Sequence, residues 1–152
     1  MRVSLHSSDE AVRRTLIPIR SWSFEKIARY GQRFYRPRDR KVGLRFAVSP
    51  SFPLEVSQLV PLFSPEVFSI ELTPLNATET TRANGFTSAV GAGDPPGSFK
   101  VVEDFRAAGF EVAICFANPA ADELRASCGM SVAANRDAPL PPRRWRNKEQ
   151  EE

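Results

Sequence analysis

Hydrophobic residues recur along the chain with the period of a strand in some segments and of a helix in others. Apolar residues alternate with small or polar ones at residues 41–48 and 67–75, which predicts two strands. They follow helical spacing at 21–35 and 98–108, which predicts two helices. Shorter segments predict strands at 2–5 and 110–116, helices at 7–17 and 54–63, and a helical turn at 121–129.

These elements follow one another in the order β-α-α-β-α-β-α-β. Strands separated by helices pair in parallel through right-handed crossovers, so the sequence predicts an α/β fold, either a small open sheet or part of a barrel. The strands lack a strongly polar face, which favours burial on both sides. Residues 1–132 form the predicted domain. The polar segment 76–97 is expected to be a lid or an insertion, and the Pro-, Arg- and Glu-rich tail 133–152 to be disordered.

The expected helix ends depend on capping residues. Ser7 and Glu10 match a capping box, and Pro18 is expected to end the helix that they begin. Ser23 is the expected N-cap of the second helix, and Gly109 is expected to end the last one. The residues expected to face the core are Val12, Leu16 and Ile17, then Phe24, Ile27, Ala28 and Phe34, and then Val56, Leu59, Val60 and Phe63.

Composition limits the classes of protein that are possible. With 152 residues, 41% of them hydrophobic, the chain is long enough for one core and too short for two. No apolar run approaches the roughly 20 residues of a membrane span, and no signal peptide is visible. Cys115 and Cys128 are expected to be reduced thiols, which favours a cytoplasmic location. Two cysteines and one histidine do not make a four-ligand zinc site without carboxylates.

Charge is distributed unevenly along the chain. Residues 1–50 contain 12 Lys or Arg and 4 Asp or Glu, whereas residues 51–152 contain 9 and 14. A basic N-terminal third suits a polyanionic partner such as RNA. The alternative is a solvated helix face that is rich in arginine because of genomic base composition, and the charge pattern alone favours the two equally.

Three segments resemble the radical S-adenosylmethionine methyltransferases that act on carbon 2 of an RNA adenine. Residues 2–19, R-V-S-L-H-S-S-D-E-A-V-R-R-T-L-I-P-I, are similar to the family's S-L-H-A, D-E-L-R and L-V-P-I run. Residues 72–76, L-T-P-L-N, are similar to its N-L-I-P-x-N-P. Residues 122–129, D-E-L-R-A-S-C-G, are similar to its G-D-D-I-x-A-A-C-G-Q-L. The resemblance covers residues 2 to about 130 and implies a six-stranded partial (β/α)6 barrel.

The resemblance implies a role for five residues. Ser4, Leu5, His6 and Asn76 match positions that contact S-adenosylmethionine in the family, and Cys128 matches the cysteine that carries the methyl group. From spacing alone, Asn76 is more simply a loop cap and Cys128 a small buried residue. If the resemblance holds, the early Ser–His corner, Asn76 and Cys128 are expected to surround one hollow at the carboxyl ends of the strands.

The sequence also departs from the family pattern. Ala117–Glu123 lacks the basic residues of the family's R-K-T-R-G-D-D run, Arg45 replaces a common acidic residue, and Ala77 replaces a proline. The C-x-x-x-C-x-x-C motif that binds a 4Fe–4S cluster is absent. The expectation is therefore a C-terminal half that is inactive alone, with any cluster supplied by a complementing N-terminal half. A truncated gene, a gene model started too late and a split enzyme all fit, and Met1 within a strand favours truncation.

Two other functions stay open. The first is a non-catalytic RNA-binding module that uses the basic residues of the N-terminal third, namely Arg13, Arg14, Arg29, Arg33 and Arg36. The second is an open-sheet α/β domain that binds a different nucleotide.

Overall fold

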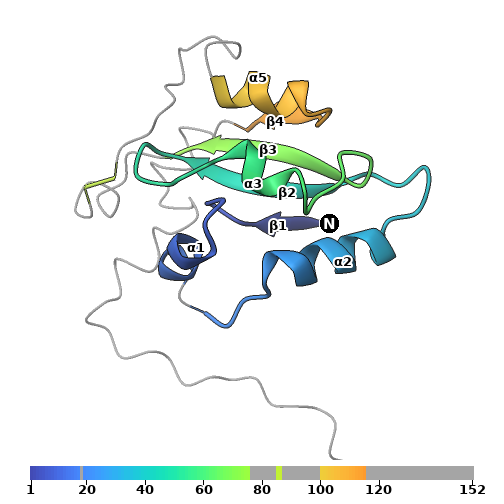
Figure 1. Cartoon of the computed structure of the whole chain (residues 1–152), viewed down its shortest axis with the longest axis horizontal. Helices are drawn as coiled ribbons and strands as arrows, with labels where there is room; N and C mark the ends of the chain where they lie inside the picture. The colour runs from blue at the N-terminus through green and yellow to red at the C-terminus, as the bar shows by residue number, and fades with distance from the viewer. Residues whose placement is uncertain (18, 76–84, 87–99, 116–152) are drawn as a thin grey trace, which may run out of the picture.

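The computed structural model of the chain describes residues 1–17, 19–75, 85–86 and 100–115 (Figure 1). Its strands are β1 (Arg2–Ser4), β2 (Val42–Val48), β3 (Phe68–Pro74) and β4 (Val112–Ile114). They form one sheet in the order β1-β2-β3-β4, and every neighbouring pair is parallel. The prediction of a parallel α/β fold is confirmed for these residues.

The helices lie between the strands in the predicted order. They are α1 (Glu10–Leu16), α2 (Phe24–Phe34), α3 (Val56–Leu59) and α5 (Lys100–Ala107). Helix α3 is much shorter than the predicted 54–63, because the chain turns after Leu59, whose carbonyl accepts hydrogen bonds from the amides of Leu62 and Phe63. The turn brings Phe63 into the core and leaves Val60 40% exposed, so the prediction that Val60 is buried is wrong.

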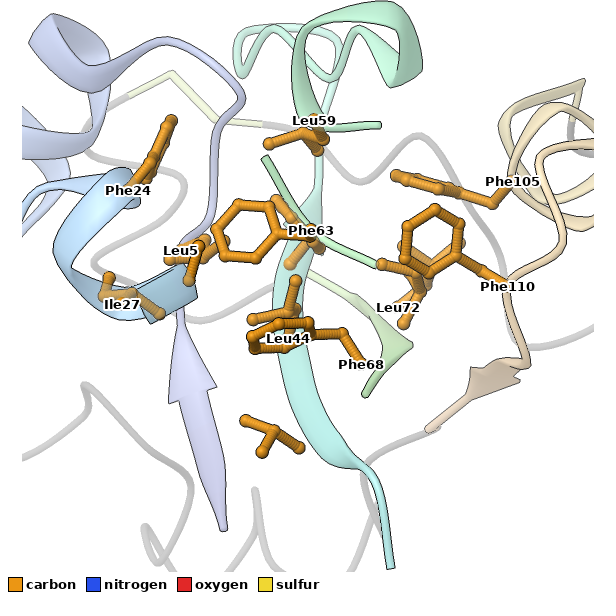
Figure 2. Packing of buried hydrophobic residues seen from close by; sticks show 14 of the residues in the cluster. Leu5, Phe24, Ile27, Leu44, Leu59, Phe63, Phe68, Leu72, Phe105 and Phe110 are labelled. Carbon is orange, nitrogen blue, oxygen red and sulfur yellow. The ribbon is translucent and has the colours of Figure 1, made fainter. Parts of the chain in front are cut away.

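One apolar layer lies between the sheet and the helices (Figure 2). Residues that pair in register on parallel strands point to the same face, so Leu44 and Ile70 point to one side together with Phe46 and Leu72. All four belong to the buried cluster that also contains residues of α2, α3 and α5. These three helices therefore cover the same face of the sheet. The core contributions of the helices and their flanking turns are Phe24, Ile27, Ala28, Leu59, Phe63, Val102, Phe105 and Phe110.

The opposite face of the sheet is polar. Arg45 and Glu71 are register partners on β2 and β3, and they form an ion pair on the side facing away from the helices. Arg2 of β1 joins the same carboxylate. The expectation that the strands lack a strongly polar face is therefore wrong, because one Arg on β2 and one Glu on β3 make an otherwise small-residue face polar.

Helix α1 begins differently from the prediction. Its N-cap is Asp9, whose side chain accepts hydrogen bonds from the amides of Ala11 and Val12. Ser7 instead donates to the carbonyl of Pro53, and Glu10 accepts from the amide of Phe24. The predicted capping box is therefore wrong, because both of its side chains are used to join α1 to distant segments.

The side of α1 that is buried is also unexpected. Arg13 is only 4% exposed, whereas Val12, Leu16 and Ile17 are half-buried. The Arg13 guanidinium donates from Nη1 to the carbonyl of Trp22 and to the hydroxyl of Ser21, and it lies over the Phe24 ring. Arg13 thus fastens α1 to the start of α2 and is removed from the surface.

Helix α2 agrees with the prediction at its start and departs from it at its end. The hydroxyl of Ser23 caps the helix by accepting from the Lys26 amide. Phe24, Ile27 and Ala28 are buried as expected, and a Cβ added at Gly31 would overlap the Phe68 ring, so this position lets the helix approach β3 closely. Phe34, in contrast, is 49% exposed, and the prediction that it faces the sheet is wrong.

Helix α5 ends at the predicted glycine. Gly109 has a φ of +89°, a conformation that side chains with a Cβ rarely adopt, and its amide donates to the carbonyl of Arg106. Segments that the structure does not describe contain Pro18, Ser98, nearly all of the predicted loop 76–97, the helical turn 121–129 and the tail 133–152. Within the described part of the chain, no helix has both the length and the apolar character that crossing a membrane requires.

Candidate functional site

The carboxyl ends of the strands meet at one edge of the sheet. Because all neighbouring pairs are parallel, the residues that follow β1, β2 and β3 leave the sheet on the same side (Figure 1). In parallel sheets and barrels, ligands bind at this edge, where strand ends and the following turns present polar groups. The described residues at this edge are therefore the first place to look for a site.

His6 is the most constrained residue at this edge. Its φ of +62° places it in the left-handed region, which costs a residue with a Cβ about 1 kcal/mol. Its Nδ1 accepts a hydrogen bond of 3.1 Å from the backbone amide of Ala47. An imidazole nitrogen that accepts is unprotonated, so in neutral His6 the proton lies on Nε2, which is then a hydrogen-bond donor.

The charge state of His6 follows from its surroundings. Burial, and after it the positive charges of Arg13 and Arg45, lower the pKa of His6 below its usual 6.5. His6 is therefore neutral at pH 7 and keeps its acceptor Nδ1. As the pH falls below about 6.5, His6 becomes protonated in the unfolded chain but not yet in the folded one. The free energy of unfolding therefore decreases between that pH and the lower folded pKa of His6.

Thr73 of β3 contributes a second polar group at the carboxyl edge of the sheet. It is the register partner of Ala47, the residue that donates to His6, and by alternation its side chain lies on the polar face of the sheet. Thr73 Oγ1 is buried and has no hydrogen-bond partner among the residues that the structure describes. A buried hydroxyl without a partner is rare in a folded protein, and one way to satisfy it is a bound ligand. We call His6, Ala47 and Thr73 the His6 corner.

The structure places the other predicted cofactor contacts unequally. Ser4 is exposed at the end of β1, in register with Arg45 on β2. Leu5 is fully buried in the core, and its amide donates to the carbonyl of Arg45, so its side chain contributes packing and does not face a ligand. Asn76 and Cys128 lie outside the described residues, so their convergence with the His6 corner stays a prediction.

An ion-pair cluster lies on the polar face, away from that edge. Arg2 Nε donates to Glu71 Oε1 at 2.7 Å, and Arg45 donates to Glu71 Oε2 from Nη2 at 3.0 Å and from Nε at 3.3 Å. A Cβ at Gly43 would lie 2.8 Å from Glu71 Oε1, so the glycine leaves room for the carboxylate. Burial acts to raise the pKa of Glu71, but the hydrogen bonds and charges of Arg2 and Arg45 outweigh it, and the pKa lies below its usual 4.5.

Glu71 also borders a cleft of about 710 Å³ near the amino ends of the strands. The wall of this cleft includes Arg2, Gly43, Ser69 and Glu111, so it combines acidic and basic groups. The sequence analysis missed both the cleft and the ion-pair cluster. The sequence does place an Arg and a Glu of opposite charge, Arg45 and Glu71, in the middle of two neighbouring predicted strands. Their contact could be predicted only if the register of the two strands were known.

The described residues hold no group of three or more His, Cys, Asp or Glu side chains arranged to bind a metal ion. Cys115 follows β4, is half-buried, and donates its amide to the carbonyl of Leu72, which extends the pairing of β3 with β4.

Comparison with known proteins returned no match. No family model fits the chain, and it is similar to none of the curated proteins and to none of the solved structures.

Proposed function

We propose that this chain is the C-terminal part of a partial (β/α)6 barrel of the radical S-adenosylmethionine type, from the family that methylates carbon 2 of an RNA adenine. In this proposal the edge at Ser4 and His6 contributes to an S-adenosylmethionine site, Asn76 adds a polar contact, and Cys128 is the methyl-carrying residue. The chain alone has no methyltransferase activity.

The single observation that best supports the proposal is the winding of the sheet. Four parallel strands lie in sequential order, and α2, α3 and α5 cover the same face. An open doubly wound sheet reverses its strand order and places helices on both faces, whereas a barrel winds in one direction and keeps its helices outside. The polar face with Arg45 and Glu71 corresponds in this proposal to the inside of the barrel. The same observation disfavours the open-sheet nucleotide-binding alternative.

The His6 corner supports a polar ligand at the carboxyl edge. S-adenosylmethionine offers amine, carboxylate, hydroxyl and adenine groups, and the corner offers a donor at His6 Nε2 and an unsatisfied hydroxyl at Thr73. When bound, this cofactor supplies the methyl group. The role of the corner is to orient it and, because His6 is neutral, to do so without adding a positive charge.

The iron–sulfur cluster that the family uses does not fit this chain by itself. Such a cluster is held by cysteine thiolates, three of them closely spaced in the family motif, and the sequence contains two cysteines separated by 12 residues (Cys115 and Cys128). A complementing chain or segment has to supply the ligands.

Calorimetric titration of the full chain with S-adenosylmethionine tests the cofactor site. His6→Ala and Thr73→Val are expected to weaken binding about tenfold each, the effect of one hydrogen bond of about 1.4 kcal/mol. Ser69→Ala is the matched control, because Ser69 lies on the same polar face near the opposite end of β3. Adenosine triphosphate binding as tightly as S-adenosylmethionine, or affinity unchanged in both variants, contradicts the proposal.

Anaerobic reconstitution with iron and sulfide tests the claim that the chain is inactive alone. The expected result is no stable cluster and no cleavage of S-adenosylmethionine under reducing conditions. A stable cluster with cofactor cleavage by the 152-residue chain refutes it.

A further inference from the structure

The outer surface of α2 carries three large aromatic side chains that are far from buried. Trp22, Tyr30 and Phe34 are 45%, 41% and 49% exposed. The Trp22 and Tyr30 rings meet edge to face with centroids 5.2 Å apart, and the Tyr30 and Phe34 rings stack with centroids 5.9 Å apart. The three rings thus form one continuous aromatic surface along the helix.

Cationic side chains border this aromatic surface. The Lys26 ammonium lies 4.6 Å from the centre of the Trp22 ring, and Arg29, Arg33 and Arg36 are all exposed. Residues 26, 30 and 34 recur every fourth position of α2 and therefore lie in one row along the helix, with Arg29 and Arg33 beside it. Trp22 precedes the helix, and its contacts with Lys26 and Tyr30 place it against this row. We call this surface the α2 stripe: Trp22, Lys26, Arg29, Tyr30, Arg33 and Phe34.

Core packing does not explain the α2 stripe. The buried side of α2 is formed by Phe24, Ile27, Ala28 and Gly31, and it already fills the space against the sheet. Grouped aromatic rings on a surface mark a binding site more often than scattered apolar residues do. The charge around the rings then selects the partner, because three cations beside three rings suit a polyanion that also offers flat apolar groups.

We propose that the α2 stripe binds single-stranded nucleic acid. Unpaired bases stack on the rings of Trp22, Tyr30 and Phe34, and the phosphates contact Lys26, Arg29 and Arg33. This combination of rings and cations is the one by which proteins hold single strands without reading their sequence, whereas a duplex hides the faces of its bases. From Lys26 to Phe34 the helical row is about 12 Å long, enough for a few nucleotides.

This surface keeps Arg29 and Arg33 of the basic residues that the sequence suggested, but not the two arginines of α1. Arg13 is buried and cannot contact a polyanion, and Arg14 is paired with Glu10 on α1. The α2 stripe is also separate from the His6 corner, because it lies on the outside of the helix layer and the corner lies on the polar side of the sheet. Nucleic-acid binding therefore does not depend on the cofactor proposal and is tested without S-adenosylmethionine.

Fluorescence anisotropy of labelled 12-nucleotide oligouridine and oligodeoxythymidine tests the proposal on the full chain. Binding is expected to both, with a steep dependence on salt, and to be weaker for a 12-base-pair duplex. Tyr30→Leu and Phe34→Leu keep apolar bulk but remove the ring face, and each is expected to weaken binding roughly tenfold. Arg33→Ala is expected to lower the slope of log affinity against log salt by about 0.7.

Matched controls and opposing outcomes keep the test decisive. Ile19→Ala removes an apolar side chain that is 72% exposed, and Arg106→Ala removes an exposed charge on α5, far from α2 (Figure 1); both are expected to leave affinity within twofold. Circular dichroism melting verifies that every variant is folded. The proposal is overturned by equal affinity for the duplex, or by an affinity that neither Tyr30→Leu nor Phe34→Leu changes. Equal affinity for polyglutamate also overturns it, because the partner would then be an acidic polypeptide.

Discussion

The two faces of the four-stranded sheet are built from alternate residues of the same strands, and they do different work. On β2, Val42, Leu44 and Phe46 point to the helices and are at most 1% exposed. The residues that alternate with them, Gly43, Arg45 and Ala47, point to the other side, where the ion-pair cluster and the His6 corner lie. A shift of one residue in register would exchange the two sets.

The difference separates stability from chemistry. The helix-covered face buries rings and aliphatic side chains and so contributes most of the free energy of folding. The polar face contributes little to it, because partly exposed ion pairs gain little over their hydration. Substitutions on the two faces are therefore expected to differ first in the size of their effect on stability and then in its dependence on pH and salt.

The largest effect is expected on the helix-covered face. Phe68 is fully buried. Its ring packs edge to face against the Phe63 ring, with centroids 5.0 Å apart, and occupies the space that Gly31 leaves by having no side chain. Phe68→Ala is expected to lower the free energy of unfolding by about 3–5 kcal/mol, through lost burial and the cavity left behind. Urea denaturation measures the loss.

The control for this prediction makes the same chemical change at the surface. Phe34→Ala removes a ring that is 49% exposed, and it is expected to cost less than about 1 kcal/mol. Similar losses in the two variants would mean that the core of the folded chain is not the layer that contains Phe68.

A smaller and pH-dependent effect is expected on the polar face. Glu71→Gln removes the charge that holds Arg2 and Arg45, and it is expected to cost about 1 kcal/mol at pH 7. Since the pKa of Glu71 is lowered by folding, its contribution is complete above the usual value of 4.5 and is lost as the pH falls through the folded value. The difference between wild type and variant is thus expected to shrink below about pH 4.5.

Urea denaturation of both proteins at pH 7 and at several values down to pH 3 measures this difference. Glu66→Gln is the matched control, because Glu66 is exposed just before β3 and forms none of the ion pairs of the described residues. A difference that stays constant over the whole range would mean that the Glu71 charge contributes no stability.

The long periodic elements were predictable from the sequence because local and tertiary forces agree in them. In β2, β3 and α2, the apolar positions repeat often enough to set both the type of element and its buried face.

The start of α1 could not be predicted in the same way. Three possible capping residues follow one another there, Ser7, Ser8 and Asp9, and their intrinsic capping preferences do not distinguish them. The choice is made by Pro53, whose carbonyl accepts from both serines and leaves Asp9 to cap the helix.

The candidate site was predictable only in its location. Strand ends can be read from the sequence, which is why Ser4 and His6 were expected at the carboxyl edge. The hydrogen bond from Ala47 to His6 joins residues 41 positions apart, and Thr73 lies beside Ala47 only through the register of β2 with β3. Pattern analysis does not supply register, so the contacts of the site could not be derived.

The smallest effect is expected at the rim of the polar face. Arg2 is 68% exposed in its side chain, whereas Arg45, which binds the same carboxylate, is 38% exposed and donates twice. Arg2→Ala is expected to lower the free energy of unfolding less than Arg45→Ala does, because water replaces the lost bond more easily at the exposed position. Raising the salt concentration to about 1 M shortens the screening length to about 3 Å and is expected to abolish most of the Arg2 effect. A double-mutant cycle of Arg2→Ala with Glu71→Gln isolates the pair energy. A pair energy that stays unchanged in high salt would mean that the Arg2–Glu71 pair is shielded from water, and the two faces would then differ in chemistry but not in their exposure to solvent.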